Sequence, residues 1–244
     1  MAQRSRRDYG SRARIGLAVP HANPTVEPEL GVLMPDGVAA YATRLTHPSP
    51  RVEDRLQHYI RHIPQAIATF GPMRLDAFGF GCTGSSYLAG VALEDELAAA
   101  ACATSNLPVV TAAQALRRAL ATLGVSRFAL VSPYPADLAA AGLRYWRDSG
   151  FEVSASLRVA PMLDDTHAIY ELTSADALRA AREVDRRGAG ALVITGTGMP
   201  TLAALRVLQA ECALPVLSSN LCLAWALLQA AAPELAPPTP AGLL

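Results

Sequence analysis

The sequence contains no lysine, and all 21 of its basic residues are arginines. This absence excludes chemistry that needs a lysine Schiff base, such as pyridoxal phosphate catalysis, and it excludes a Walker A phosphate loop. We expect no nucleotide and no other cofactor. Because 21 acidic residues balance the arginines, net charge gives no argument for nucleic acid or a membrane as a partner.

Cysteine and histidine are scarce, and neither forms a metal-binding pattern. No CxxC pair and no Cys/His ligand spacing occurs, so the chain is typical of a cytoplasmic protein with free thiols. His58 and His62 are four residues apart on a predicted helix, but no HExxH motif or third ligand accompanies them. We therefore predict a solvated face there and no metal. The cysteines are Cys82, Cys102, Cys212 and Cys222.

Long apolar runs are missing as well, so no segment is predicted to span a bilayer. A composition of 51% hydrophobic and 17% charged residues over 244 positions favours a globular protein, with one large domain or two fused halves. Residues 1–13 are rich in arginine but lack a signal-peptide core. An organelle presequence is one interpretation, and a flexible basic tail is the one we favour. The proline-rich residues 233–244 predict a second flexible tail.

Paired segments in the same order indicate an internal duplication. Residues 14–20 (RIGLAVP) and 127–133 (RFALVSP) share a plan in which a short apolar run ends at proline. Residues 107–116 (LPVVTAAQAL) are echoed by residues 214–223 (LPVLSSNLCL). These repeats predict two halves built on one plan.

A third pair of segments makes the two halves chemically different. Residues 76–87 (DAFGFGCTGSSY) and 191–202 (ALVITGTGMPTL) are each an apolar run that breaks at glycine and hydroxyl residues and then becomes helical. Cys82 and Gly196 stand at equivalent positions in the two segments. Only the first half therefore has a thiol at this equivalent position.

Short apolar runs alternate with helical stretches, which predicts an α/β protein. We expect two Rossmann-like halves related by a pseudo-twofold axis, over residues 14–120 and 121–232, each a parallel sheet flanked by helices. The active site would lie in the cleft between them. The boundaries are approximate, helices can be exchanged between the halves, and the Ala/Leu-rich helices are compatible with a homo-oligomer. The predicted strands are 15–19, 76–80, 128–132 and 191–195, and the predicted helices are 51–70 with a kink at Pro64, 91–103 and 176–187.

Cys82 is the strongest candidate for catalysis. It follows a predicted strand and begins a Gly/Ser-rich turn into a helix, where backbone N–H groups stabilise a thiolate or a substrate carboxylate. Ligands of open α/β sheets bind at this end of the strands. The alternative is an inert residue buried at a tight turn, and we prefer that interpretation for the other three cysteines.

Four motifs in order resemble those of the maleate cis–trans isomerases: the first strand and loop, the first cysteine motif, a Pro-Tyr pair and the second cysteine motif. The wider relatives are the arylmalonate decarboxylases and the aspartate/glutamate racemase superfamily. The resemblance extends from about residue 14 to residue 228. The motifs are residues 19–29 (VPHANPTVEPE), 81–85 (GCTGS), 133–134 (PY) and 199–202 (MPTL).

This resemblance implies a small carboxylate as the substrate and assigns roles to individual residues. Cys82 matches the nucleophile of the isomerases and an acid/base of the racemases. Asn23 matches an asparagine that binds a substrate carboxylate, and Tyr134 matches a tyrosine whose hydroxyl points at the substrate. Turn formation before Pro24 and an ordinary loop aromatic are the respective alternatives. Two carboxylate-binding turns are matched by Thr83 with the backbone of Gly84 and Ser85, and by Thr197 with Gly198.

The chain departs from the family pattern at two places. Gly196 stands where the second cysteine is expected. Asp165 and Thr166 stand roughly where the isomerases have an asparagine that contacts the substrate, so that contact is in doubt. His21 and His167 could lie near the mouth of the cleft, but the sequence does not place them.

A single thiol limits the reactions that the resemblance allows. Two-base racemisation is not expected, because it needs a thiol on each face of the substrate carbon. A Cys82 thiolate can instead add to an activated double bond, allow rotation and leave again. We therefore rank a maleate-type cis–trans isomerase first, since residues 19–29 are most like that branch. An arylmalonate-type decarboxylase with Cys82 as proton donor comes second, and a non-catalytic carboxylate-binding homologue third.

Overall fold

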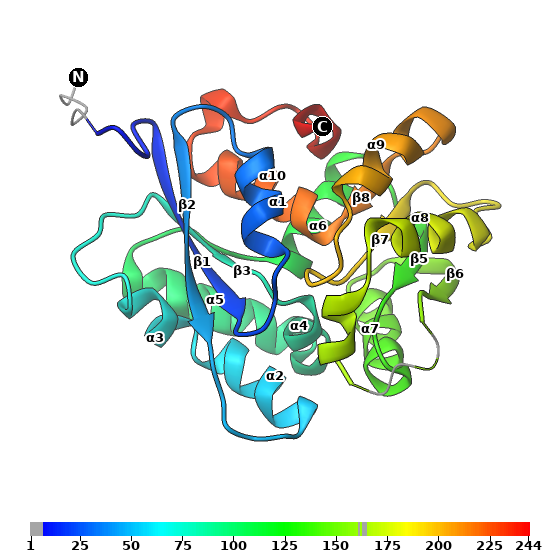
Figure 1. Cartoon of the computed structure of the whole chain (residues 1–244), viewed down its shortest axis with the longest axis horizontal. Coiled ribbons are helices and arrows are strands. Elements are labelled where there is room, and N and C mark those ends of the chain that lie inside the picture. Colours follow the sequence, from blue (N-terminus) through cyan, green and yellow to red (C-terminus); the bar gives the residue numbers. More distant parts are fainter. Residues whose placement is uncertain (1–6, 161, 163–164) are drawn as a thin grey trace.

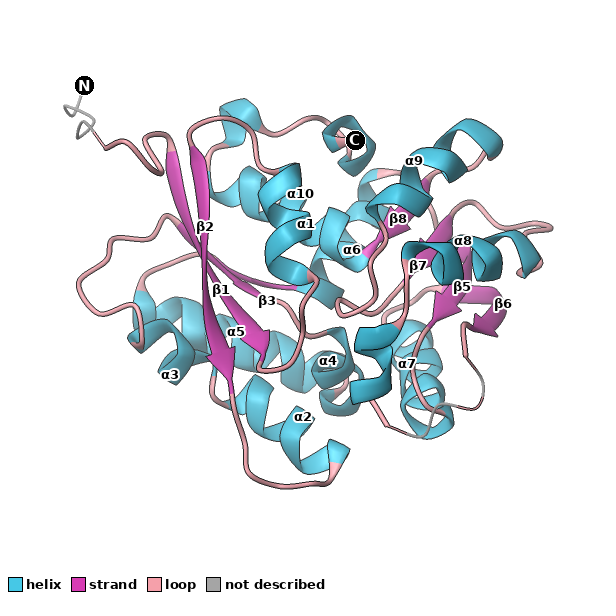
Figure 2. Cartoon of the chain, viewed as in Figure 1, coloured by secondary structure: helices cyan, strands magenta, loops and turns pink. Residues whose placement is uncertain are grey.

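The chain folds around two parallel four-stranded sheets of identical topology (Figures 1 and 2). The structure is a computed structural model, and it describes residues 7–160, 162 and 165–244. The sheet orders are β2-β1-β3-β4 and β6-β5-β7-β8, so each strand of the first half has a counterpart in the second. The strands are β1 (Ala13–Pro20), β2 (Val38–Leu45), β3 (Ala77–Phe80), β4 (Val109–Thr111), β5 (Arg127–Ser132), β6 (Glu152–Arg158), β7 (Leu192–Ile194) and β8 (Val216–Ser218).

The predicted α/β architecture with two parallel sheets is confirmed, and the four predicted strands occur as β1, β3, β5 and β7. These are the inner strands, whose side chains are almost all buried on both faces, so they appear in the sequence as continuous apolar runs. The edge strands β2, β4, β6 and β8 were not predicted. β2 and β6 are only partly buried, so they lack such a run, and β4 and β8 are buried but only three residues long.

Helices cover both sheets, and the predicted helix over 51–70 is interrupted at His62. It forms two helices because Pro64 sits in the first turn of the second one, where the missing N–H of proline costs nothing. The helices are α1 (Val26–Leu33), α2 (Val52–Arg61), α3 (Ile63–Ala68), α4 (Thr83–Ala89), α5 (Val91–Ser105), α6 (Ala112–Thr122), α7 (Ala136–Asp148), α8 (Ser174–Glu183), α9 (Leu202–Glu211) and α10 (Ser219–Ala231), with 3-10 helices η1 (His167–Glu171), η2 (Pro233–Leu235) and η3 (Pro240–Leu243).

Two helices connect the halves. Helix α10 follows β8 in the chain but packs on α6, α1 and β3 of the first half. Its Leu227 lies so close to Gly79 that a Cβ on that glycine would approach Leu227 Cδ1 to 2.7 Å. Helix α4 of the first half packs on α7 of the second, where Trp146 Nε1 donates a hydrogen bond of 3.0 Å to the hydroxyl of Tyr87. Helix α4 is therefore held from both sides.

The structure describes part of the predicted N-terminal tail and all of the predicted C-terminal tail. Residues 1–6 lie outside the described residues, and Arg12 forms a 3.5 Å ion pair with Glu234. Residues 233–244 were expected to form a flexible tail, but they form η2 and η3 against α10. Trp225 Nε1 donates a 2.9 Å hydrogen bond to the carbonyl of Pro237, and Pro240 is buried, so this segment is packed.

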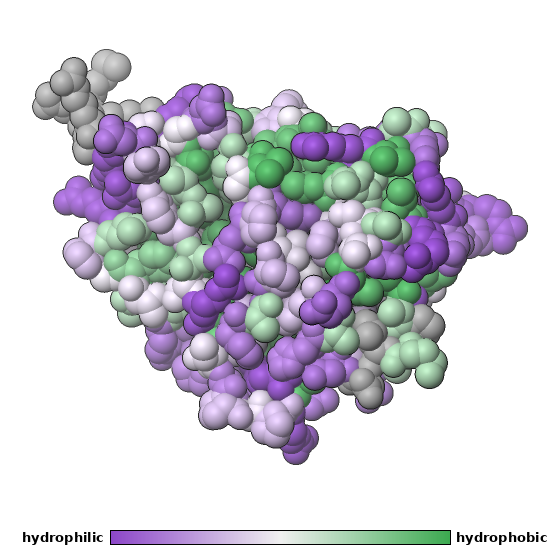
Figure 3. Space-filling model, viewed as in Figure 1, coloured by the Kyte–Doolittle hydropathy of each residue, from purple (hydrophilic) through white to green (hydrophobic). Residues whose placement is uncertain are grey.

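The surface of the molecule is mostly hydrophilic on the face drawn in Figure 3, with apolar groups gathered near α1, α9 and the C-terminus. Val32 of α1 and Val207 of α9 are exposed. The expectation of a homo-oligomer stays a prediction. Within the described residues, no helix has both the length and the apolar character that a membrane span requires.

A buried carboxylate joins α1 to the second half. Glu29 accepts hydrogen bonds from the backbone N–H groups of Thr201 (2.5 Å) and Leu202 (2.9 Å), at the start of α9. It also accepts a 2.8 Å hydrogen bond from Nδ2 of Asn220 on α10, which in turn donates to the carbonyl of Thr197 at 3.1 Å. Glu29 thus completes the open N-terminus of α9 and supports the loop that follows β7.

We predict that Glu29→Ala destabilises the protein by about 3 kcal/mol, because it leaves several buried donors without an acceptor. Urea unfolding followed by circular dichroism measures the change. Glu27→Ala on the same helix is the matched control. Its carboxylate is partly exposed and paired with Arg44, so its loss should cost less than about 1 kcal/mol. Equal losses for the two variants would contradict the structural role given to Glu29.

Candidate functional site

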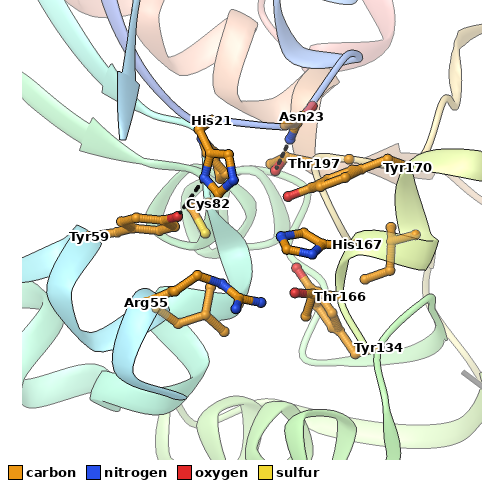
Figure 4. A pocket seen from close by; sticks show the side chains of 15 residues that line it. His21, Asn23, Arg55, Tyr59, Cys82, Tyr134, Thr166, His167, Tyr170 and Thr197 are labelled. Carbon is orange, nitrogen blue, oxygen red and sulfur yellow. Dashed lines mark hydrogen bonds between the residues drawn. The ribbon is translucent and has the colours of Figure 1, made fainter. Parts of the chain in front are cut away.

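The site lies between the two sheets, where the inner strands end. Asn23 follows β1, Cys82 follows β3, Tyr134 follows β5 and Thr197 follows β7 (Figure 4). The carboxyl ends of parallel strands leave loops and helix N-termini free to bind a ligand. Because the two sheets share one topology, equivalent loops of both halves meet at one pocket. The lining residues are Pro20, His21, Asn23, Arg55, Leu56, Tyr59, Cys82, Gly84, Tyr134, Thr166, His167, Ile169, Tyr170, Thr197 and Gly198.

Cys82 points into this pocket from the N-terminus of α4 and is only 5% exposed. The hydroxyl of Ser85 donates a 3.2 Å hydrogen bond to its Sγ atom. Burial raises the pKa of the Cys82 thiol, while hydrogen bonds from the Ser85 hydroxyl and from the backbone of Ser85 and Gly84 act in the opposite direction. The resting sulfur is therefore a protonated thiol with thiolate-stabilising donors already beside it.

Loops of the two halves are bonded to each other at the pocket wall. Asn23 Nδ2 donates to Oγ1 of Thr197 at 3.3 Å, and that hydroxyl donates to the carbonyl of Gly81 at 2.8 Å. The Asn23 side-chain oxygen accepts from the N–H of Thr25 at 2.9 Å, so the turn role of Asn23 is present as well. Thr25 Oγ1 donates to the carbonyl of Gly198 at 2.7 Å. This wall is a connected set of polar groups from both halves.

Three phenols surround the thiol. Burial is the main cause that raises the pKa of Tyr59, to about 12, and of Tyr134 and Tyr170, and the charge that Cys82 carries when ionised is a further cause for each. The charge of Arg55 lowers the pKa of Tyr59 and Tyr170 in part. All three hydroxyls therefore stay protonated near neutral pH and can donate hydrogen bonds to an anionic ligand.

The polar rim of the pocket was not predicted from the sequence, except that His21 and His167 were named as residues that could lie near the mouth of the cleft. His21 and His167 both line it, with ring centroids 5.7 Å apart. The Nδ1 atom of His21 lies 3.1 Å from the hydroxyl of Tyr59. Arg55 and Tyr59 come from α2 and Tyr170 comes from η1, and no motif in the sequence marks them. The spacing of Arg55 and Tyr59, four residues apart on one helix face, is the one signal that could have linked them.

Six of the residues expected from the sequence line the pocket: Cys82, Asn23, Gly84, Tyr134, Thr197 and Gly198. Thr83 and Ser85 are fully buried beneath it. Thr83 Oγ1 donates to Oγ of Ser219 at 3.1 Å, and Ser85 reaches the site only through Cys82. The structure thus brings the expected residues together, with Thr83 and Ser85 behind the residues that line the pocket.

Gly196 does not line the pocket. Its φ is +93°, and a Cβ built there would lie 2.4 Å from Cγ of Pro133. A side chain at this position meets both backbone strain and a proline ring. The equivalence of Gly196 to a second cysteine stays a prediction, but the pocket, as the described residues define it, contains a single cysteine.

Thr166 lines the pocket, and its neighbour Asp165 lies outside it. The carboxylate of Asp165 is 3.5 Å from Arg55 and 3.4 Å from the ring of His167. Hydrogen bonding from the backbone of His167 and the charges of His167 and Arg55 lower the pKa of Asp165 against the opposing effect of burial. In the described part of the chain, no group of three or more His, Cys, Asp or Glu side chains is arranged to hold a metal ion.

Fold and pocket together define a two-sheet α/β protein with one thiol in a cleft of polar donors. The sequence model of the arylmalonate decarboxylase family matches residues 15–244, and the chain therefore belongs to this family. The maleate isomerase of Nocardia farcinica is 30% identical over 88% of this chain and 89% of its own. That of Geobacillus stearothermophilus is 24% identical over 84% and 86%.

Solved structures agree with this assignment. A structure of the Nocardia farcinica maleate cis–trans isomerase, with one cysteine replaced by serine and a covalently bound succinylcysteine intermediate, has a TM-score of 0.79 at 25% identity. It covers 89% of this chain and 92% of that one. Unliganded arylmalonate decarboxylase has a TM-score of 0.72 at 21% identity, covering 90% and 92%, which shows a shared fold.

We predict that alkylation of Cys82 by iodoacetamide is slow at pH 7.5 and accelerates as the pH rises past the usual range of a free cysteine, because burial raises its pKa. Ser85→Ala removes a donor to the sulfur and should slow the reaction at pH 7.5 by about threefold to tenfold. Peptide mass spectrometry follows each site, and the exposed Cys102 is the internal reference. An unchanged ratio of Cys82 to Cys102 labelling in Ser85→Ala would refute the proposed stabilisation.

We also predict that Gly196→Ala costs about 3 kcal/mol of stability, from positive-φ strain plus the contact with Pro133. Gly150→Ala, just after the end of α7, is the matched control. Gly150 has a φ of +83° but no neighbouring atom within 4 Å of a built Cβ, so it reports the strain alone, about 1 kcal/mol. Urea unfolding compares the two variants. A loss at Gly196 no larger than at Gly150 would show that the contact with Pro133 costs little.

Proposed function

We propose that this protein is a cofactor-independent enzyme that converts a small maleate-type cis-dicarboxylate to its trans isomer, with Cys82 as nucleophile. The observation that carries the proposal is the single buried thiol at the start of α4, facing a pocket whose other walls present amide, phenol, imidazole and guanidinium donors. Its curated relatives are maleate isomerases, and a covalent succinylcysteine has been captured in the Nocardia farcinica enzyme.

The reaction is an addition of the Cys82 S–H group across the double bond, followed by elimination. Sulfur bonds to one alkene carbon, and the π electron pair moves onto the other carbon and its carboxylate as an enediolate. That carbon takes the proton of the thiol, which gives a succinyl thioether. After rotation about the new single bond, loss of the proton and of sulfur forms the trans alkene and restores the thiol. The raised pKa of Cys82 keeps the required proton on the resting sulfur.

The donors of the pocket are suited to the charge that forms in this step. We assign Asn23, Thr197 and Gly198 to one substrate carboxylate, on the wall where the two halves are bonded to each other. Tyr134 faces the thiol from the second half, and the turn of Thr83, Gly84 and Ser85 holds the sulfur and its immediate surroundings. Fixed, protonated donors at a developing enediolate lower the barrier without reorganisation during the reaction.

An arylmalonate-type decarboxylase is the second candidate. The family model that covers residues 15–244 bears that name, and a protonated thiol is also the group that would deliver a proton to an enediolate after loss of carbon dioxide. An aryl substituent, however, needs an extended apolar wall. The aliphatic side chains of the lining are Leu56 and Ile169, together with the ring of Pro20, whereas His21, Arg55 and His167 make the rim polar.

We predict that the protein forms fumarate from maleate without releasing carbon dioxide, and that Cys82→Ala lowers the rate at least about a thousandfold while the fold is retained. Proton NMR follows the loss of maleate and the formation of fumarate or of a decarboxylated product. Cys102→Ala, which removes an exposed thiol on α5, is the matched control. Full activity in Cys82→Ala would contradict both enzymatic proposals. Carbon dioxide release from phenylmalonate instead would favour the decarboxylase, and carboxylate binding without turnover of either compound would favour a non-catalytic protein.

A further inference from the structure

Arg55 is a cation in the wall of the pocket that none of the assigned roles uses. It lies on α2, is 5% exposed, and contributes its side chain to the lining beside Tyr59 and Cys82. Figure 4 shows its guanidinium on the opposite side of the pocket from Asn23 and Thr197. A buried charge is costly unless an opposite charge and hydrogen bonds compensate it.

The compensation that Arg55 receives within the protein is incomplete. Nη1 donates to the carbonyls of Ser49 (3.2 Å) and Pro50 (2.5 Å), which fix the side chain but carry no net charge. Among the described residues its one carboxylate partner is Asp165, 3.5 Å from Nη2, a distance at the limit of a hydrogen bond. The side chain of Asp165 is 48% exposed, so water screens the attraction.

The other groups that face Arg55 leave the pocket without negative charge. Around it lie the Tyr59 and Tyr170 phenols, which stay protonated, and the rings of His21 and His167 on the rim. The described lining contains no aspartate or glutamate. An anion that enters this pocket would therefore meet a guanidinium whose charge is only partly compensated, together with several neutral donors, an arrangement that attracts negative charge.

We propose that Arg55 binds the second carboxylate of the substrate, the one remote from Asn23 and Thr197, and so selects dicarboxylates over monocarboxylates. Asp165 is the partner that this carboxylate displaces. The inference deepens the proposed function, on which the choice of ligand rests. A planar guanidinium can bind a carboxylate through two parallel hydrogen bonds, which fixes the orientation of the ligand as well as its charge.

A purely structural role makes a different prediction. Nη1 ties the segment Ser49–Pro50 to α2, and if this were the whole role of Arg55, its replacement would lower stability but change the affinity for mono- and dianionic ligands equally. The ratio of the two affinities therefore separates the two roles.

The experiment uses the full chain with Cys82→Ala, so that binding is measured without turnover. Isothermal titration calorimetry compares maleate with its monomethyl ester, which lacks one charge but keeps the carbon skeleton. We expect this protein to prefer maleate at least tenfold, and this first comparison needs no change at Arg55. Adding Arg55→Gln should weaken maleate binding about thirtyfold or more and leave the ester nearly unaffected. Arg55→Lys, which keeps the charge but not the planar fork, should fall between.

Two further variants complete the design. Arg51→Gln, one turn earlier and 71% exposed, is the matched control and should bind maleate normally. Asp165→Asn removes the competing carboxylate and should strengthen maleate binding severalfold. Circular dichroism and thermal melting establish that each variant is folded.

The outcomes distinguish this inference from the proposed function. Equal affinity for maleate and its ester, or an Arg55→Gln protein that still prefers maleate, overturns the role of Arg55 and leaves the isomerase proposal standing. Arg55-dependent binding of maleate in the Cys82→Ala protein, together with no fumarate formation by the chain that retains Cys82, overturns the isomerase proposal alone. Failure to bind any of maleate, fumarate or phenylmalonate contradicts both.

Discussion

The site depends on one buried carboxylate that holds the two halves together. Glu29 comes from the first half, and its hydrogen-bond donors on Thr201, Leu202 and Asn220 all come from the second. A carboxylate has two acceptor oxygens with about four acceptor sites and no donor, whereas a neutral amide of the same size has one acceptor oxygen. Because Asn220 also bonds to the loop after β7, the position of Thr197 in the pocket follows from the position of α1.

The pocket buries two groups, Cys82 and Arg55, whose charged forms have opposite signs and are both disfavoured by burial. Burial disfavours the thiolate of Cys82, and it also disfavours the incompletely compensated charge of Arg55. An anionic ligand would relieve the second of these costs. The thiol receives its own compensation from Ser85 and from the first turn of α4, a helix that is held by both halves. The protein thus keeps the reactive atom protonated and its anion-stabilising groups fixed before a ligand arrives.

Much of the fold could be predicted because the inner strands are buried on both faces. The continuous apolar runs that become β1, β3, β5 and β7 need no partner to be recognised. The edge strands β2 and β6 could not be found in this way, since most of their side chains are only partly buried. The C-terminal segment misled the prediction for a related reason. Its prolines predict an extended chain, but the indole of Trp225 and the surface of α10 give it something to pack on.

The same division applies to the site. The sequence by itself determined that Cys82 follows a buried strand, that Asn23, Tyr134 and Thr197 follow strands of the same kind, and that lysine chemistry is absent. These are local facts of strand, turn and helix. Tertiary structure alone decided that Arg55, Tyr59 and Tyr170 face the thiol, and that a side chain at Gly196 would meet Pro133. The physical reason is that a pocket between two halves is built from segments more than a hundred residues apart, such as Arg55 and Asp165, whose juxtaposition leaves no periodic signal along the chain.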